Sequence, residues 1–136
     1  MVSSVLGGGD ARNLQAWQRA NVFYESLEDI CTEMDLGRDK EWLLYLIREV
    51  GRSIPEAIAD GWQRESVAET LLSMYEAQSA LEMIAYYLVF LGGEGFLAES
   101  RVAEVDNARL TLESMLSGLI EAVREERTLR TRHNLN

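Results

Sequence analysis

Apolar residues recur at spacings of three and four through four long stretches of the chain, and this spacing constrains the fold more than any other feature. Side chains three and four positions apart share one face of an α-helix. In the first stretch the apolar or small positions are Leu14, Trp17, Ala20, Tyr24, Leu27, Cys31 and Met34. The pattern predicts a helix that starts at Asp10 or Asn13 as N-cap and closes at Gly37.

Three more stretches have the same character. The second begins near Asp39, the third opens at the capping-box sequence Ser66-Val67-Ala68-Glu69 and ends at the glycine cluster 92–95, and the fourth begins near Ser100. No stretch alternates with the period of two that marks a strand. Four helices of about 25 residues each suit an antiparallel up-down-up-down four-helix bundle, so we expect an all-α fold.

The only proline of the chain, Pro55, lies inside the second helical stretch. Proline lacks the backbone donor and clashes with the preceding turn, at a cost of roughly 3 kcal/mol in a helix interior. Ser53 and Glu56 have the spacing of a capping box, and Gly61 follows as a helix stop. The sequence therefore predicts that the second helix is kinked or restarted at Pro55.

The chain has 136 residues and one cysteine, Cys31. We expect one domain, with a flexible leader at 1–9, the bundle at 10–128 and a basic tail at 129–136. A single cysteine cannot form an internal disulfide, no apolar run approaches the length of a membrane span, and the leader does not resemble a signal peptide. These features favour a cytoplasmic protein without membrane contact.

The formal net charge of −10 argues against broad attraction to phosphate backbones or anionic membranes. The positive charges of the C-terminal region are the exception and are candidates for contacting RNA: Arg124, Arg127, Arg130 and Arg132. The alternative is that these arginines complement the dipole at the end of the last helix.

The residue types needed for catalysis or metal binding are scarce. The one histidine, His133, lies in the tail, so the chain has no Glu-x-x-His motif for a di-metal bundle site and no zinc ligand set. Cys31 lies on the apolar stripe, far in sequence from a base that would activate it. The glycine cluster at 92–95 sits between helices, where it is expected to terminate one. We predict a protein that is not an enzyme and has no metal or cofactor.

Two helices carry more apolar residues than one buried face needs. In the second helix Trp42, Leu44 and Tyr45 fall outside the stripe, and the third has a second stripe that ends in Tyr86 and Phe90. A helix that is apolar around most of its circumference is covered on more than one side. We predict a partner or oligomer interface made by Trp42, Tyr45, Tyr86, Tyr87 and Phe90. Packing within the chain is the alternative, and base stacking is disfavoured because no cations lie nearby.

A polar network is expected near the proline. Arg48 and Arg52 are four positions apart and share a helix face, where they either bind a phosphate or pair with Glu82 or Asp60 across the bundle. Ion pairs are favoured because the carboxylates would compete with a phosphate. The predicted structural network comprises Arg48, Arg52, Ser53, Asp60 and Glu82.

Three segments carry a family resemblance: Trp17-Gln18-Arg19-Ala20, the run from Arg52 to Gly61, and Ala77-Gln78-Ser79-Ala80-Leu81-Glu82. In order and spacing, residues 13 to 126 resemble the bacterial four-helix bundle family. That family includes proteins encoded in intervening sequences of large-subunit ribosomal RNA genes and the accessory variability proteins of diversity-generating retroelements. Relative to the signature Ser-Ile-Pro-x-Asn-Ile-Ala-Glu-Gly, this chain has Ala57 and Asp60 in place of asparagine and glutamate.

The resemblance implies a non-enzymatic homo-oligomer, typically a pentamer, and in the retroelement branch an accessory subunit that binds a reverse transcriptase and its RNA. We therefore expect an accessory or scaffold protein that binds itself, a reverse transcriptase and possibly RNA. The alternative is an acidic protein–protein interaction adaptor of the same fold that binds no nucleic acid.

Overall fold

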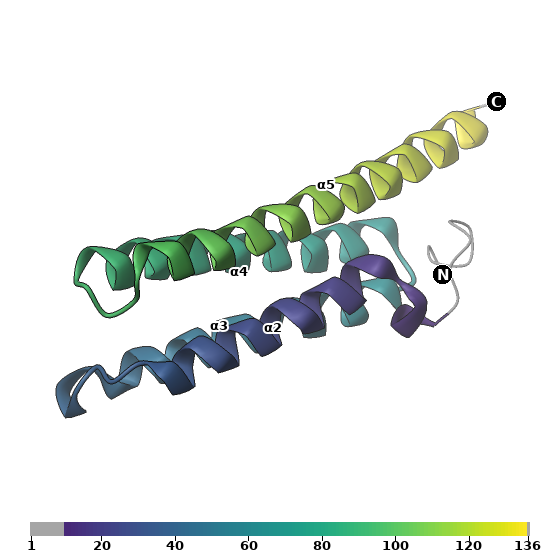
Figure 1. Cartoon of the computed structure of the whole chain (residues 1–136). Coiled ribbons are helices and arrows are strands. Elements are labelled where there is room, and N and C mark those ends of the chain that lie inside the picture. Colours follow the sequence, from purple (N-terminus) through teal and green to yellow (C-terminus); the bar gives the residue numbers. More distant parts are fainter. Residues whose placement is uncertain (1–9, 136) are drawn as a thin grey trace.

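Four long α-helices and two short 3-10 turns make up the part of the chain that the computed structural model describes, residues 10–135 (Figure 1). The elements are η1 (Ala11–Asn13), α2 (Gln15–Glu33), η2 (Arg38–Lys40), α3 (Glu41–Trp62), α4 (Val67–Gly93) and α5 (Glu99–Leu135). The described residues contain no strand. The prediction of an all-α, four-helix fold is confirmed. The side chains of Asn13 and 127–136 and the whole predicted leader, 1–9, lie outside the description.

Each long helix packs mainly against two neighbours: α2 and α4 both contact α3 and α5. Figure 1 shows α2 with α3 along one side of the bundle and α4 with α5 along the other. The Arg101–Glu33 pair, at 2.9 Å, joins the start of α5 to the end of α2. Ser73 near the start of α4 donates to Asp60 near the end of α3, at 3.4 Å. These two pairs support an antiparallel arrangement of α3 and α4 and a contact between α2 and α5. The complete up-down-up-down order stays a prediction.

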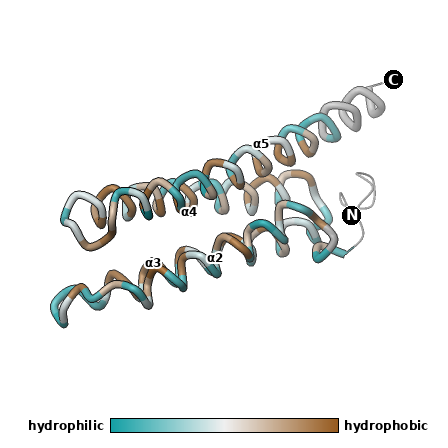
Figure 2. The backbone as a smooth tube through the Cα atoms, in the orientation of Figure 1, coloured by the Kyte–Doolittle hydropathy of each residue, from teal (hydrophilic) through white to brown (hydrophobic). Residues whose placement is uncertain are grey.

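The core is mainly aliphatic, and all four long helices contribute to it. Buried apolar residues recur along each long helix. Figure 2 shows the matching alternation of brown and teal segments along the tube. The largest fully buried side chains are Phe23, Leu27, Ile30, Ile47, Ile54, Ile58, Met74, Leu81, Ile84, Leu91, Leu112 and Leu116. Burial of such a face supplies most of the stability of helices in a bundle.

The second long helix does not restart at its proline, because α3 is continuous from Glu41 to Trp62 with Pro55 inside it. Ser53 is not an N-cap: its hydroxyl donates to the carbonyl of Val50 at 2.6 Å, a bond within the helix. Pro55 is buried and offers no N–H to the carbonyl of Gly51, the residue one turn earlier. Tertiary packing of the flanking apolar residues thus holds the helix together across the missing bond, and the kink stays a prediction.

Several helix ends differ from the expected positions. The first long helix ends at Glu33, four residues before Gly37, which has a φ of 80° and precedes η2. The helices are also less equal than expected, with 19, 22, 27 and 37 residues from α2 to α5. The start of α4 is as predicted, since the Ser66 hydroxyl accepts from the Glu69 amide at 3.1 Å. Helix α5 continues through most of the predicted tail, 129–136.

Candidate interaction surface

Large apolar side chains stand exposed to solvent along α3 and α4. Three of the most exposed are aromatic: Trp42 at 60%, Tyr45 at 64% and Tyr86 at 72%. We call the group the aromatic face and define it as Trp42, Tyr45 and Leu46 on α3 with Met83, Tyr86, Val89 and Phe90 on α4. Exposed apolar side chains are ordinary when scattered singly, whereas seven of them on two helices that pack against each other indicate an interaction site.

The two halves of the aromatic face meet at one end of the bundle. The hydrogen bond between Ser73 and Asp60 sets the register of the antiparallel pair α3 and α4. Trp42 lies eighteen residues before Asp60 on α3, and Leu91 lies eighteen residues after Ser73 on α4. The register therefore places Trp42 opposite Leu91, next to Phe90. The ring centroids of Phe90 and Phe96 are 6.4 Å apart. The ammonium nitrogen of Lys40, just before α3, lies 5.8 Å from the centroid of the Phe96 ring.

The α4 part of the aromatic face is poor in charge for the surface of this chain. The seventeen residues from Ala77 to Gly93 contain one charged residue, Glu82, in a protein of net charge −10. A solvent-facing helix surface normally carries charged side chains. Met83, which belongs to the second stripe of this helix, and Val89 are the further exposed apolar residues of this charge-poor stretch.

Four of the five predicted interface residues, Trp42, Tyr45, Tyr86 and Phe90, lie on the aromatic face. Tyr87 does not belong there, because it is partly buried and packs against the core. Leu46, the residue after Tyr45, is 36% exposed and joins the face. Helix geometry explains both positions, because successive side chains along a helix point in directions about 100° apart.

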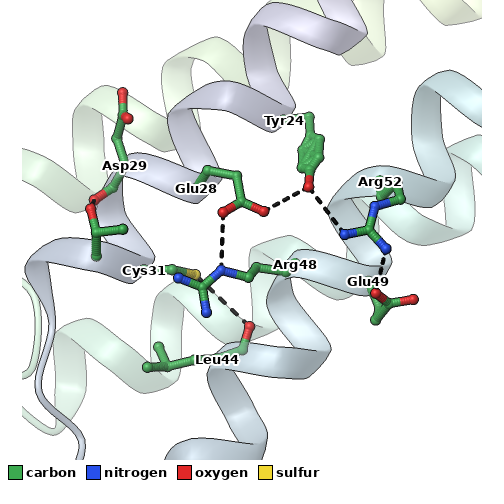
Figure 3. A network of polar contacts seen from close by, with 9 residues as sticks. Tyr24, Glu28, Asp29, Cys31, Leu44, Arg48, Glu49 and Arg52 are labelled. Carbon is green, nitrogen blue, oxygen red and sulfur yellow. Dashed lines mark hydrogen bonds and ion pairs between the residues drawn. The ribbon is translucent and has the colours of Figure 1, made fainter.

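A polar network connects α2 and α3, and its α3 residues follow Tyr45 within two turns of the helix (Figure 3). Arg48 donates to Glu28 at 3.0 Å, and the Tyr24 hydroxyl donates to the same carboxylate at 2.6 Å. Arg52 pairs with Glu49 at 2.6 Å and donates to the Tyr24 hydroxyl at 3.4 Å. The hydrogen bond from Tyr24, and after it the contact with Arg48, lowers the pKa of Glu28. The network ties α2 to α3.

Arg48 and Arg52 do form ion pairs as favoured, but the expected partners were wrong. Asp60 pairs instead with Arg64 at 2.9 Å. Glu82 lines a shallow groove between α4 and α5 with Tyr75, Gln78, Ser79 and Glu113. The sequence could not show that Glu28 lies opposite Arg48, because the pairing depends on the register of α2 against α3. With carboxylates beside both arginines, the site is poorly suited to a phosphate.

Groups with catalytic or metal-binding potential are sparse in the described residues. Among the residues whose side chains the structure describes, 10–12 and 14–126, no group of three or more His, Cys, Asp or Glu is placed to hold a metal ion. The Cys31 thiol is buried among core residues, and burial raises its pKa to about 11. A thiol with that pKa is a poor nucleophile at neutral pH. Among the same residues, no helix is long and apolar enough to cross a membrane.

The candidate RNA-contacting arginines lie on the last turns of α5. The guanidinium of Arg124 stands 5.7 Å from the centre of the Tyr75 ring, a cation–π contact to α4. The side chains of Arg127, Arg130 and Arg132 lie outside the described residues. Arg124 is therefore already engaged with the bundle, which leaves the prediction of RNA contact to the other three.

Comparison with protein-family models and with curated proteins gives no match for this chain.

Proposed function

We propose that this protein is a non-enzymatic accessory or scaffold protein that acts by assembling with copies of itself and with a protein partner. The observation that carries the proposal is the aromatic face, where Trp42, Tyr45 and Tyr86 are each more than half exposed. Full burial of a large apolar side chain is worth roughly 1.5–3 kcal/mol, and the exposed fraction of each of these side chains forgoes the corresponding part of it. A partner that covers them recovers it.

The finer proposal is a retroelement-type accessory subunit whose partner is a reverse transcriptase. Its support is the family resemblance of residues 13 to 126, carried best by the run from Arg52 to Gly61. The pentameric state belongs to the same proposal. A polymerase with a basic surface would complement the excess of negative charge on this chain, and the arginines at the end of α5 would contribute the contact with RNA.

The alternative is an acidic adaptor that binds proteins and no nucleic acid. The net charge of −10 favours it, because nucleic-acid affinity depends on the density of cations at the contact. The cation–π contact of Arg124 with Tyr75 favours it as well, since it gives one of the four arginines a structural role.

Two measurements test the proposal. Light scattering of the purified chain at micromolar concentration is expected to give the mass of more than one copy, and a single-chain mass would remove the basis of the scaffold. Mixing with a purified reverse transcriptase from the same type of element is expected to give co-elution. Binding of structured RNA that weakens steeply with salt, and that is lost when Arg124, Arg127, Arg130 and Arg132 become alanine, would favour the retroelement subunit over the adaptor.

A further inference from the structure

We infer that the aromatic face is a two-fold symmetric contact in which α4 of one copy packs antiparallel to α4 of a second copy, centred on Tyr86. This inference rests on the proposed self-assembly and adds the occupant of the face, the symmetry of the contact and the residue at its centre. It replaces the pentamer of the finer proposal with an even-numbered assembly.

The first argument is area. Aromatic side chains present about 150–250 Å² each, so the exposed fractions of Trp42, Tyr45, Tyr86 and Phe90 amount to on the order of 500 Å². Leu46, Met83 and Val89 are 36%, 45% and 73% exposed and extend this surface. The sum is the upper limit of what the face can bury, and it is close to the about 800 Å² that each partner buries in a stable interface of standard size.

The second argument is charge, and it points to a second copy as the occupant. Two copies of a chain with net charge −10 repel unless they meet where charge is sparse. The stretch of α4 from Ala77 to Gly93 holds one charged residue, so the same face can lie against itself without opposing like charges at its centre. A basic partner would instead gain most from an acidic surface.

The third argument fixes the direction of the contact. Toward the other end of the same two helices the exposed surface carries more acid than base, with Glu56, Asp60, Glu69 and Glu76 against Arg64, which pairs with Asp60 at 2.9 Å and lies 3.8 Å from Glu69. If the copies lay parallel, these carboxylates would face their equivalents, which is destabilising. An antiparallel contact centred on Tyr86 overlaps the two aromatic ends and directs the two acidic ends away from each other. It also sets Met83 of one copy opposite Val89 of the other.

Cysteine pairing distinguishes the two directions. Tyr86→Cys lies beside the two-fold axis and is expected to form a covalent dimer under mild oxidation. Leu72→Cys is the matched variant, because Leu72 is 64% exposed on α4 and lies fourteen residues away, roughly 21 Å at 1.5 Å per residue. The antiparallel contact separates the two Leu72 positions by about twice that distance, so Leu72→Cys should cross-link at least tenfold more slowly. Equal rates for the two variants would overturn the inference.

Tyr86→Asp tests the face itself, and Leu110→Asp is its control, since Leu110 is an exposed apolar residue on α5. We expect Tyr86→Asp to weaken self-association at least 100-fold, since a carboxylate would be buried against its copy, and Leu110→Asp to leave it unchanged. Circular dichroism checks that both variants keep their helices.

The outcomes separate this inference from the proposed function. A wild-type oligomer that Tyr86→Asp leaves intact would overturn the aromatic face as the contact and leave self-assembly standing. A two-fold contact gives even-numbered assemblies, so a wild-type mass of five chains would overturn the inference and support the pentamer that the resemblance implies. A single-chain wild type would contradict both.

Discussion

Gly61 lies where α3 and α4 approach closely, and replacing it with alanine gives a quantitative test of their packing. A Cβ at position 61 would stand 2.6 Å from the Cβ of Ser73 and 3.3 Å from the backbone carbonyl of Thr70. Neither atom is the end of a flexible side chain, so the helices must separate. The carbonyl of Gly61 also accepts from the Thr70 hydroxyl at 2.9 Å, which ties the two helices together.

The magnitude follows from two opposing terms. Overpacking of a closely packed contact costs about 1–3 kcal/mol, whereas replacing a helical glycine by alanine gains about 0.5–1 kcal/mol. Gly118→Ala on α5 receives the second term alone, because a Cβ at position 118 would meet no atom within 4 Å. The difference between the two variants therefore isolates the contact, and Gly61→Ala should be less stable than Gly118→Ala by about 1–3 kcal/mol.

Urea unfolding followed by circular dichroism measures this difference, with all proteins at one concentration because self-association would add to apparent stability. Gly51→Ala gives an intermediate case, since its closest contact would be the end of the Leu27 side chain, at 2.7 Å. Equal stabilisation of Gly61→Ala and Gly118→Ala would refute the close approach of α3 and α4.

Three further predictions concern single side chains. Native protein should leave Cys31 unlabelled by a thiol reagent near neutral pH, because burial raises its pKa to about 11, and unfolded protein should label at once; rapid native labelling would contradict the burial. The pKa of Glu28 is lowered in the fold, so the ionised Glu28 stabilises the folded state at pH values above its ordinary pKa of 4.5, and this stabilisation is lost as the pH falls below that value. Glu28→Gln should therefore be less stable than wild type near pH 7. A stability difference between the two proteins that grows on acidification would contradict the assignment. Ser66→Ala should cost about 0.5–2 kcal/mol through loss of the α4 cap, against little change for the exposed Ser114→Ala in unfolding experiments.

The number and type of helices could be predicted from the sequence because apolar spacing reports directly on helical periodicity. The start of α4 was predictable for the same local reason, since Ser66 and Glu69 are three residues apart. The predicted restart at Pro55 was wrong. The prediction considered the hydrogen bond lost at the proline and the possible serine cap, but it left out the packing of the helix against the rest of the bundle. Buried Ile54 and Ile58, on either side of Pro55, supply that packing.

The candidate surface was predictable in part. Excess apolar residues on two helices identified Trp42, Tyr45, Tyr86 and Phe90, but the rotation of each helix about its axis decides which neighbours join them. That rotation placed Tyr87 against the core and Leu46 in solvent. The partners of Arg48 and Arg52 were beyond the sequence for a similar reason, since they depend on how α2 and α3 align.

The central claim is that the aromatic face is an interface between copies of this chain. The oligomeric mass of the wild-type protein, compared with that of Tyr86→Asp, tests the claim most directly. Light scattering at micromolar concentration is predicted to give an assembly of more than one chain for wild type and a single chain for the variant, with both proteins equally helical. A wild type with the mass of one chain, or a Tyr86→Asp variant with the mass of the wild-type assembly, would contradict the claim.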